Sequence, residues 1–239
     1  MSTSPKFKVK LFSDGADLKS MLAMNDNPLV SGMTTNPSLM KKAGISDYRS
    51  FAKQVLASVT RKPVSFEVFS DDVVEMERQA DEITTWGKNV FVKIPVTNST
   101  GQSTLELVKK LTQRGVNLNI TAILTLKQIE EVCTALRGGA PSVVSVFAGR
   151  IADTGRDAVP FMKATVEHCK RAGPQCESLW ASTREVYNLV QADEVGCAII
   201  TVPFDILAKL KMWKMDLGEL SLDTVTMFKK DSEAAGFQL

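Results

Sequence analysis

The stretch VFVKIPV (90–96), GQSTLELVKKLTQRG (101–115) and LNITAIL (118–124) decides the fold. The two outer segments are short and rich in Val, Ile and Leu, which predicts buried strands, and the middle segment is predicted to be a helix. A strand, a helix and a second strand in this order form a parallel pair joined by a right-handed crossover. The stretch therefore predicts an α/β protein with a parallel sheet.

The same alternation runs along the whole chain. Eight strand–helix units suit a closed barrel better than a doubly wound open sheet, and neither GxGxxG nor GxxxxGK[ST] follows any strand. We therefore predict a (β/α)8 TIM barrel in one domain over residues 1–239, with an extra C-terminal helix. The predicted strands are 8–14, 29–35, 64–69, 90–96, 118–124, 142–149, 178–182 and 197–203. The predicted helices include 17–24, 47–59, 70–87, 101–115, 125–139, 157–173, 183–196, 204–213 and 222–235, and Pro37 is expected in the first turn of another.

The composition excludes several classes of protein. The net charge is +2, and acidic and basic residues are interspersed along the chain. The sequence therefore lacks the basic stretch that would predict binding to nucleic acid or to a membrane surface. No apolar run reaches 18 residues, and the first ten residues lack the apolar core of a signal peptide. The four cysteines form no CxxC pair, so we expect reduced thiols in a cytoplasmic protein.

Lys93 lies in the middle of a predicted buried strand. An unpaired ammonium is costly to bury, so such a group tends to lose its proton. A neutral amine in a dry cavity can attack a ketose carbonyl to form a carbinolamine and then an imine, which withdraws electrons and allows the adjacent C–C bond to break. Asp14 and Glu67 are candidates to move the protons. The alternative for Lys93 is a structural ion pair with Glu67.

Polar residues recur at alternate positions of the other predicted strands. Ser65 and Glu67 lie two apart, as do Asn119 and Thr121, so each pair shares one face of its strand. Because the active sites of barrels lie at the C-terminal ends of the strands, we expect these side chains to meet there. Ser145, Asp14, Asn36 and Ser182 are expected near the same end. The alternative is that each is a hydrogen-bonded polar residue of the core.

These residues also belong to a set of motifs that resembles one family. The segments FSDGAD (12–17), TTNPSL (34–39), FVKIPVT (91–97), NLNITAILT (117–125), VSVFAGRIAD (144–153), ASTR (181–184) and ITVPFDIL (200–207) are similar to those of the transaldolases and the related fructose-6-phosphate aldolases. The resemblance covers the whole chain. It implies a (β/α)8 barrel with a Schiff-base lysine on the fourth strand, which is the predicted strand of Lys93.

The resemblance implies a role for each candidate residue. Lys93 forms the imine, Asp14 is the acid/base carboxylate, and Glu67 acts through a water molecule that Thr121 holds. Asn36 and Asn119 orient the hydroxyls of the three-carbon unit, and Ser145 lies near the lysine and these hydroxyls. Arg150, Ser182 and Arg184 bind phosphate, a role that suits guanidinium groups and a helix start after the seventh strand. Arg150 has the alternative of a surface salt bridge.

Two positions bear on the choice between transfer and cleavage. In the resembling aldolases, glutamine stands at the position of Glu67 and tyrosine at that of Phe147. Phenylalanine cannot deliver a proton, so this chain is expected to transfer a dihydroxyacetone unit from a ketose phosphate, such as sedoheptulose 7-phosphate or fructose 6-phosphate, to an aldose phosphate. Three residues depart from the family pattern: Gly15, Thr183 and Trp180, whose indole either enters the mouth of the site or packs outward under a helix.

Other functions stay open or are disfavoured. A metal-dependent aldolase usually needs several histidines, whereas His168 is the single histidine and lies in a predicted helix, so we expect neither a metal nor a cofactor. One alternative is an aldolase of the same family or an aldolase or transaldolase tuned to a modified ketose. The other is a non-catalytic barrel that binds sugar phosphates. The last predicted helix has an apolar stripe (Leu222, Val225, Phe228) that closes its own barrel or meets a neighbouring subunit, so a homo-oligomer is possible on this pattern.

Overall fold

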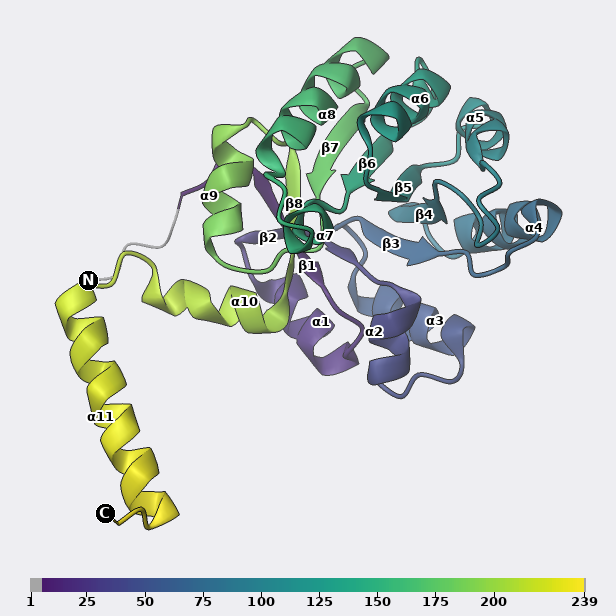
Figure 1. Cartoon of the computed structure of the whole chain (residues 1–239). Helices are drawn as coiled ribbons and strands as arrows, with labels where there is room; N and C mark the ends of the chain where they lie inside the picture. Colours follow the sequence, from purple (N-terminus) through teal and green to yellow (C-terminus); the bar gives the residue numbers. More distant parts are fainter. Residues whose placement is uncertain (1–5, 239) are drawn as a thin grey trace. The chain divides into compact units, whose positions relative to one another are not determined.

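A closed barrel of eight parallel strands is the central feature of the computed structural model, which describes residues 6–238. Each strand pairs with the next along the chain, and the last pairs with the first. Figure 1 shows the strands around a common centre. The prediction of a (β/α)8 barrel is confirmed. The strands are β1 (Lys10–Asp14), β2 (Val30–Thr34), β3 (Val64–Glu67), β4 (Val90–Pro95), β5 (Leu118–Ile123), β6 (Ser142–Val146), β7 (Cys176–Trp180) and β8 (Ile199–Pro203).

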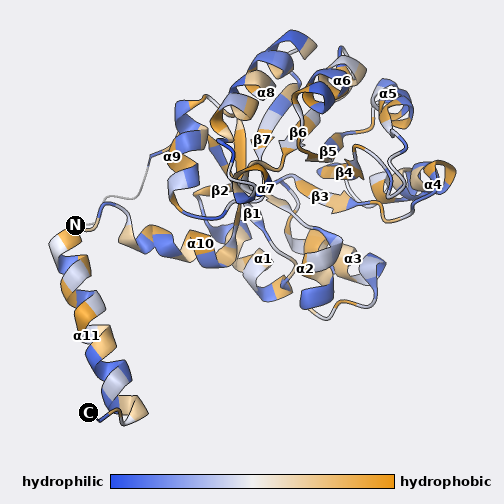
Figure 2. Cartoon of the chain, in the orientation of Figure 1, coloured by the Kyte–Doolittle hydropathy of each residue, from blue (hydrophilic) through white to orange (hydrophobic). Residues whose placement is uncertain are grey.

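Helices connect the strands, and most of them lie outside the ring in Figure 1, whereas one short helix, α7, lies across its middle. Figure 2 shows apolar residues on the strands and polar residues along the helices. The helices of the barrel are α1 (Leu18–Asp26), α2 (Pro37–Lys42), α3 (Tyr48–Ser58), α4 (Val73–Thr84), α5 (Leu105–Gln113), α6 (Leu126–Leu136), α7 (Ala148–Asp153), α8 (Val159–Ala172), α9 (Tyr187–Glu194) and α10 (Phe204–Ala208). No helix among residues 6–238 is both long and apolar enough to span a membrane.

The strands bury side chains on both faces. Val92 and Ile94 of β4 are almost completely buried, as expected for a parallel strand covered by helices. Inside the ring, an apolar cluster that includes Phe12, Leu179 and Ile199 fills the barrel. The polar residues predicted on the same faces lie further toward the C-terminal ends of the strands.

Several segments differ from the sequence-based prediction. The helix predicted over 183–196 begins at Tyr187, and the last helix begins at Leu217, five residues before the predicted start at 222. The run 142–149 is not one strand, because β6 ends at Val146 and α7 starts at Ala148. The seventh strand lies two residues earlier than predicted, so Ser182 falls outside it. The helix predicted over 204–213 divides into α10 and a 3-10 helix, η1 (Lys209–Met212).

The chain separates into two compact units, the barrel over Phe7–Leu207 and a second unit to which, among the described residues, Lys6 and the segment from Ala208 belong. The second unit contains η1 and α11 (Leu217–Ala235), the expected extra C-terminal helix. No residue of α11 is buried, so its apolar stripe of Leu222, Val225 and Phe228 is not covered within its own unit. The single domain over residues 1–239 and the homo-oligomer stay predictions.

Candidate active site

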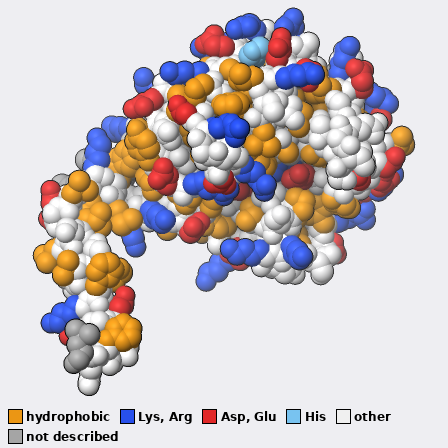
Figure 3. All heavy atoms as spheres, viewed as in Figure 1, with side chains coloured by type: hydrophobic (Ala, Val, Ile, Leu, Met, Phe, Trp, Pro, Cys, Tyr) orange, Lys and Arg blue, Asp and Glu red, His pale blue; other side chains and the backbone are white. Residues whose placement is uncertain are grey.

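A cavity of about 520 Å³ opens at the C-terminal ends of the strands, and every strand contributes residues to its wall. This volume lies in the range of small-molecule sites in proteins. Figure 3 shows acidic and basic side chains together near the middle of the corresponding face. The structure brings all the candidate residues to this cavity: Asp14, Asn36, Glu67, Lys93, Asn119, Thr121, Ser145, Phe147, Arg150, Ser182 and Arg184.

Strand register explains how the central residues meet. Glu67 on β3 is the register partner of Lys93 on β4, and Lys93 is the partner of Asn119 on β5. Side chains at partnered positions lie next to each other on the same face of a sheet. The three polar groups therefore form a row across the inner wall of the barrel.

Lys93 is buried and paired. Its Nζ lies 3.0 Å from Oε2 of Glu67 and donates a hydrogen bond of 3.0 Å to the backbone oxygen of Thr35. The Lys93 and Glu67 side chains are only 8% and 15% exposed. The ion pair that the sequence left as an alternative is present. Because desolvating two charges cancels much of their attraction, such a pair contributes little net stability.

Asp14 lies at the end of β1 in the same cavity. Its Oδ1 accepts a 2.7 Å hydrogen bond from the hydroxyl of Thr34, whose oxygen is also 2.5 Å from Oγ1 of Thr201. Burial raises the pKa of Asp14, and the negative charge of Glu67 adds to this effect, while Lys93 and the Thr34 hydroxyl oppose it. A carboxyl group with a raised pKa is suited to exchange protons with a bound substrate.

Asn119 is held in one orientation by two neighbours. Ser145 donates from Oγ to Oδ1 of Asn119 at 2.6 Å, and Nδ2 of Asn119 donates to Oγ of Ser65 at 2.9 Å. These bonds leave one amide hydrogen and one lone pair for a ligand. Asn36 is also partly engaged, because its Oδ1 caps α2 by accepting from the backbone N–H of Leu39 at 2.9 Å, and Pro37 occupies the first turn as predicted.

Thr121 precedes an irregularity in β5. The next residue, Ala122, has a positive φ of 60°, and the register between β5 and β6 shifts at this point. The hydroxyl of Thr121 is buried and has no hydrogen-bond partner within the described part of the chain. Because a buried hydroxyl without a partner is costly, this group is available to bind a ligand or a water molecule.

Helix α7 and the loop after β7 form the basic side of the cavity. The guanidinium group of Arg150 lies 5.6 Å from the centre of the Phe147 ring, which is a cation–π contact, and Arg150 forms no salt bridge with any residue of 6–238. Arg184 forms an exposed ion pair with Asp153 of α7. Arg184 does not start a helix, because α9 begins three residues later at Tyr187.

Ser182 reaches the cavity through an unusual backbone conformation. Its φ is 62°, so the alternation of β7 does not continue to this residue. A Cβ at Gly149 would lie 1.6 Å from the backbone oxygen of Ser182, so only glycine permits this approach of α7. Trp180 does not enter the cavity: Leu179 and Ala181 line it instead, and the indole is 2% exposed on the other face of β7.

The other two departures also have a structural explanation. A Cβ at Gly15 would lie 2.2 Å from Cε2 of Phe204, so the aromatic ring occupies the space of a larger side chain. Thr183 lines the cavity and donates from Oγ1 to the backbone oxygen of Thr201 at 2.7 Å.

Sequence reasoning missed three residues that support the site. Thr34 donates to Asp14 and is itself in contact with the hydroxyl of Thr201. The sequence did contain an indication of both threonines, because each is a polar residue at an inward-facing position of its strand. The hydroxyl of Tyr48 accepts from the backbone N–H of Glu67 at 2.7 Å and lies 3.0 Å from its carbonyl oxygen. Tyr48 thereby holds the end of β3, and no sequence pattern indicated this contact.

Comparison with known proteins identifies the family. The family model described as transaldolase/fructose-6-phosphate aldolase matches residues 11–239. This chain belongs to the transaldolase/fructose-6-phosphate aldolase family. Membership indicates an enzyme of the aldolase or transaldolase type, and it agrees with the resemblance that the motifs carry.

Relatives of this family cover nearly the whole chain. A probable transaldolase from Dehalococcoides mccartyi is 36% identical over 202 residues, which span 84% of this chain and 90% of the relative. One from Methanococcus maripaludis is 35% identical over 202 residues, spanning 84% and 89%. One from Thermoanaerobacter sp. is 32% identical over 231 residues, spanning 97% and 100%.

A solved structure shares the fold. An HpcH/Hpal aldolase/citrate lyase family protein from Burkholderia cenocepacia superimposes with a TM-score of 0.56 over 90% of this chain and 95% of that chain. Its sequence is 11% identical, so the similarity concerns the barrel alone.

Proposed function

We propose that this member of the family is a transaldolase that transfers a dihydroxyacetone unit from a ketose phosphate to an aldose phosphate through a Schiff base on Lys93. The observation that carries the proposal is the 3.0 Å pair between the Lys93 amine and the Glu67 carboxylate at the centre of a cavity. Glu67 lies where it can accept the proton that the amine must lose before it attacks a carbonyl.

The chemistry then proceeds with these groups. The Lys93 nitrogen bonds to C2 of the ketose, the carbinolamine loses water, and a protonated imine forms. Asp14 takes the proton from the C4 hydroxyl, the C3–C4 bond breaks, and its electrons move into the imine to leave an enamine. An aldehyde product departs. The enamine then attacks the carbonyl carbon of the acceptor, and Asp14 returns the proton to the new hydroxyl, which leaves the product bound as a protonated imine. One water molecule adds to C2 of this imine and the C–N bond breaks, so the ketose product departs and the Lys93 amine is free again.

The walls of the cavity suit the rest of the substrate. Asn119 and Asn36 keep hydrogen-bonding capacity toward the cavity and would hold the hydroxyls of the three-carbon unit. Thr121, with its unpartnered hydroxyl, would hold the water through which Glu67 acts. Arg150, Arg184 and Ser182 would bind the phosphate of either sugar, since guanidinium groups match phosphate oxygens in geometry and charge.

Phe147 favours transfer over simple cleavage. Its ring lines the cavity and carries no hydroxyl that could protonate the enamine. Without a proton donor at that place, the enamine persists until an acceptor aldehyde arrives. Cleavage to free dihydroxyacetone is the second candidate activity, and a non-catalytic sugar-phosphate-binding role is disfavoured because a buried lysine–glutamate pair gives a binder no advantage.

Hydride trapping tests the proposal. The protein is incubated with fructose 6-phosphate and borohydride, and its mass and the modified peptide are determined. We expect one adduct on Lys93, no adduct in Lys93→Met, and a normal adduct in the control Lys163→Met, because Lys163 is an exposed residue of α8. Release of dihydroxyacetone without an acceptor would identify the aldolase activity, and labelling of another lysine would refute the assignment.

A further inference from the structure

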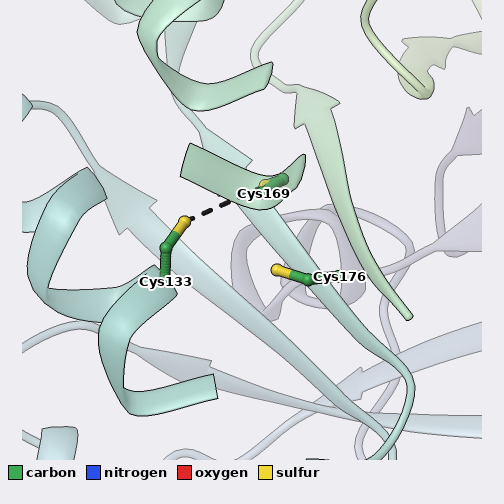
Figure 4. Close-up of side chains that lie close together, drawn as sticks. All are labelled: Cys133, Cys169 and Cys176. Carbon is green, nitrogen blue, oxygen red and sulfur yellow. Dashed lines mark hydrogen bonds between the residues drawn. The ribbon is translucent and has the colours of Figure 1, made fainter. Parts of the chain in front are cut away.

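Three cysteines that lie far apart in the sequence meet on the outside of the barrel. Cys133 belongs to α6, Cys169 to α8 and Cys176 to β7, and their sulfur atoms all lie within 4.8 Å of one another. The sulfurs of Cys133 and Cys169 are 3.9 Å apart. Figure 4 shows the three side chains converging from the two helices and the strand. We propose that this cluster binds a single thiophilic metal ion, for which Zn²⁺ is the best geometric match.

The sulfur spacing is that of a thiolate–zinc site. Thiolates bind zinc at about 2.3 Å, so two of them in a tetrahedral site lie about 3.8 Å apart. The Cys133–Cys169 separation of 3.9 Å is already close to this value. The remaining separations need to shorten by no more than about 1 Å, which a change of side-chain rotation at Cys176 can supply.

The surroundings favour a cation. Cys133 and Cys169 lie in the last turns of α6 and α8, where the free carbonyl groups of a helix carry partial negative charge. This charge stabilises a bound cation and opposes a lone thiolate. When its sulfur binds the metal, each thiol releases its proton to solvent. The two positive charges of Zn²⁺ then neutralise most of the negative charge of the three thiolates.

One coordination position is left for solvent. Among residues 6–238, no further histidine, cysteine or carboxylate joins the group. Cys133 and Cys169 are buried, whereas Cys176 is half-buried and borders a cavity of about 100 Å³ that Gly139, Ala172 and Gly173 also line. This space provides an entry path and room for a water molecule as the fourth ligand.

The cluster lies away from the candidate active site. Cys176 is the first residue of β7, so the cluster lies at the N-terminal end of a strand, opposite the end that opens into the candidate active site. A metal there would connect α6 and α8 to β7. The inference does not depend on the proposed enzymatic function, and the sequence did not indicate it because the three cysteines show no ligand spacing.

Cobalt titration tests the site. The full chain is reduced with a phosphine, freed of metal with a chelator and titrated with Co²⁺, which gives a sulfur-to-metal charge-transfer band when thiolates bind it. We expect the band to saturate at one equivalent and to vanish when Zn²⁺ displaces the cobalt. Zinc in large excess over its dissociation constant should raise the unfolding midpoint by roughly 5–10 °C.

Variants identify the ligands. Cys176→Ser and Cys133→Ala should lose both the band and the zinc-dependent rise of the unfolding midpoint. Cys197→Ser should keep both, since Cys197 is a buried cysteine of another region that donates to the backbone oxygen of Ile199. The metal-free unfolding midpoint of Cys176→Ser shows that it is folded. Absence of the band in the reduced wild type, or its persistence in folded Cys176→Ser, would overturn the proposal and leave the cluster as packed thiols.

Discussion

Lys93 Nζ lies 3.0 Å from Oε2 of Glu67, on adjacent strands whose register makes the two residues direct partners. The pair places a proton acceptor against the amine that the proposed mechanism needs as a nucleophile. Removing the negative charge while keeping the shape of the side chain therefore tests the chemistry apart from the fold.

Glu67→Gln should slow imine formation by about 10²–10⁴-fold, the range of a lost general base. The rate of borohydride trapping with fructose 6-phosphate measures this step directly. Glu106→Gln on α5 is the matched control and should trap at the wild-type rate. An unchanged trapping rate in Glu67→Gln would show that another group takes the proton.

Asp14→Asn should lose turnover by about 10²–10⁴-fold and gain stability at neutral pH. Because burial raises the pKa of Asp14 above 3.8, the folded state binds this proton more tightly than the unfolded chain. Wild-type stability therefore falls as the pH rises from about 4 through the raised pKa, and the variant lacks this loss. Urea unfolding between pH 4 and pH 8 measures the difference in stability between Asp14→Asn and the wild type. This difference should become smaller as the pH falls toward 4. Asp205→Asn is the control. A stability difference between Asp14→Asn and the wild type that is equal at every pH would contradict the assignment of this pH dependence to Asp14.

Arg184→Met should raise KM for a phosphorylated ketose by about 10–100-fold with a much smaller change in kcat, as expected for a lost charge-assisted contact. The unfolding midpoint should hardly change, because the side chains of Arg184 and Asp153 are both half-exposed and such an ion pair adds little stability. Steady-state kinetics with fructose 6-phosphate and with unphosphorylated fructose separate the effect. Arg156→Met serves as the control, and the same rise in KM for both sugars would argue against a phosphate contact.

Phe147→Tyr should increase the release of free dihydroxyacetone without an acceptor by about tenfold, the effect of one added hydrogen bond in a transition state. The new hydroxyl would supply the proton that the wild-type ring cannot. An assay for dihydroxyacetone from fructose 6-phosphate measures the change. Phe69→Tyr, which alters an exposed aromatic residue outside the cavity, should leave the release at its wild-type level.

Gly15→Ala should destabilise the protein by about 1–3 kcal/mol, as overpacking does. The new Cβ would lie 2.2 Å from the Phe204 ring. A double-mutant cycle with Phe204→Ala, measured by urea unfolding, tests this contact. The double variant should lose less free energy of unfolding than the two single variants lose together. Strict additivity would mean that the ring is not the obstacle.

Much of the fold was predictable because it depends on local patterns. Short apolar segments such as those around Ile94 and Ile120 form buried strands wherever they occur, and the helical segments between them require parallel crossovers. The misplaced elements are those whose bounds depend on distant contacts. Helix α7 begins where Gly149 packs against the backbone of Ser182, a contact that no local pattern contains.

The candidate residues on the strands were predictable for a similar reason, whereas Phe147, Arg150 and Arg184 came from the resemblance to the family. The bonding partners of these residues were not predictable. Polar residues at alternate strand positions share a face, so their meeting at one end of the barrel followed from the sequence. Which atoms bond to which was decided by strand register and packing, as the bonds of Asn119 to Ser145 and Ser65 show. Trp180 shares its strand parity with Ser182, yet only Ser182 reaches the cavity, because a positive φ interrupts the alternation.

The amino-acid sequence by itself determined the barrel, the strand that carries Lys93 and the polar residues that face inward, because hydrophobic periodicity and strand alternation act over a few neighbouring positions. The tertiary structure alone decided that Lys93 is paired with Glu67, that Trp180 points away from the cavity and that Cys133, Cys169 and Cys176 come together. Such contacts join residues far apart in the chain, and they form only when the closed barrel and its helices pack against one another.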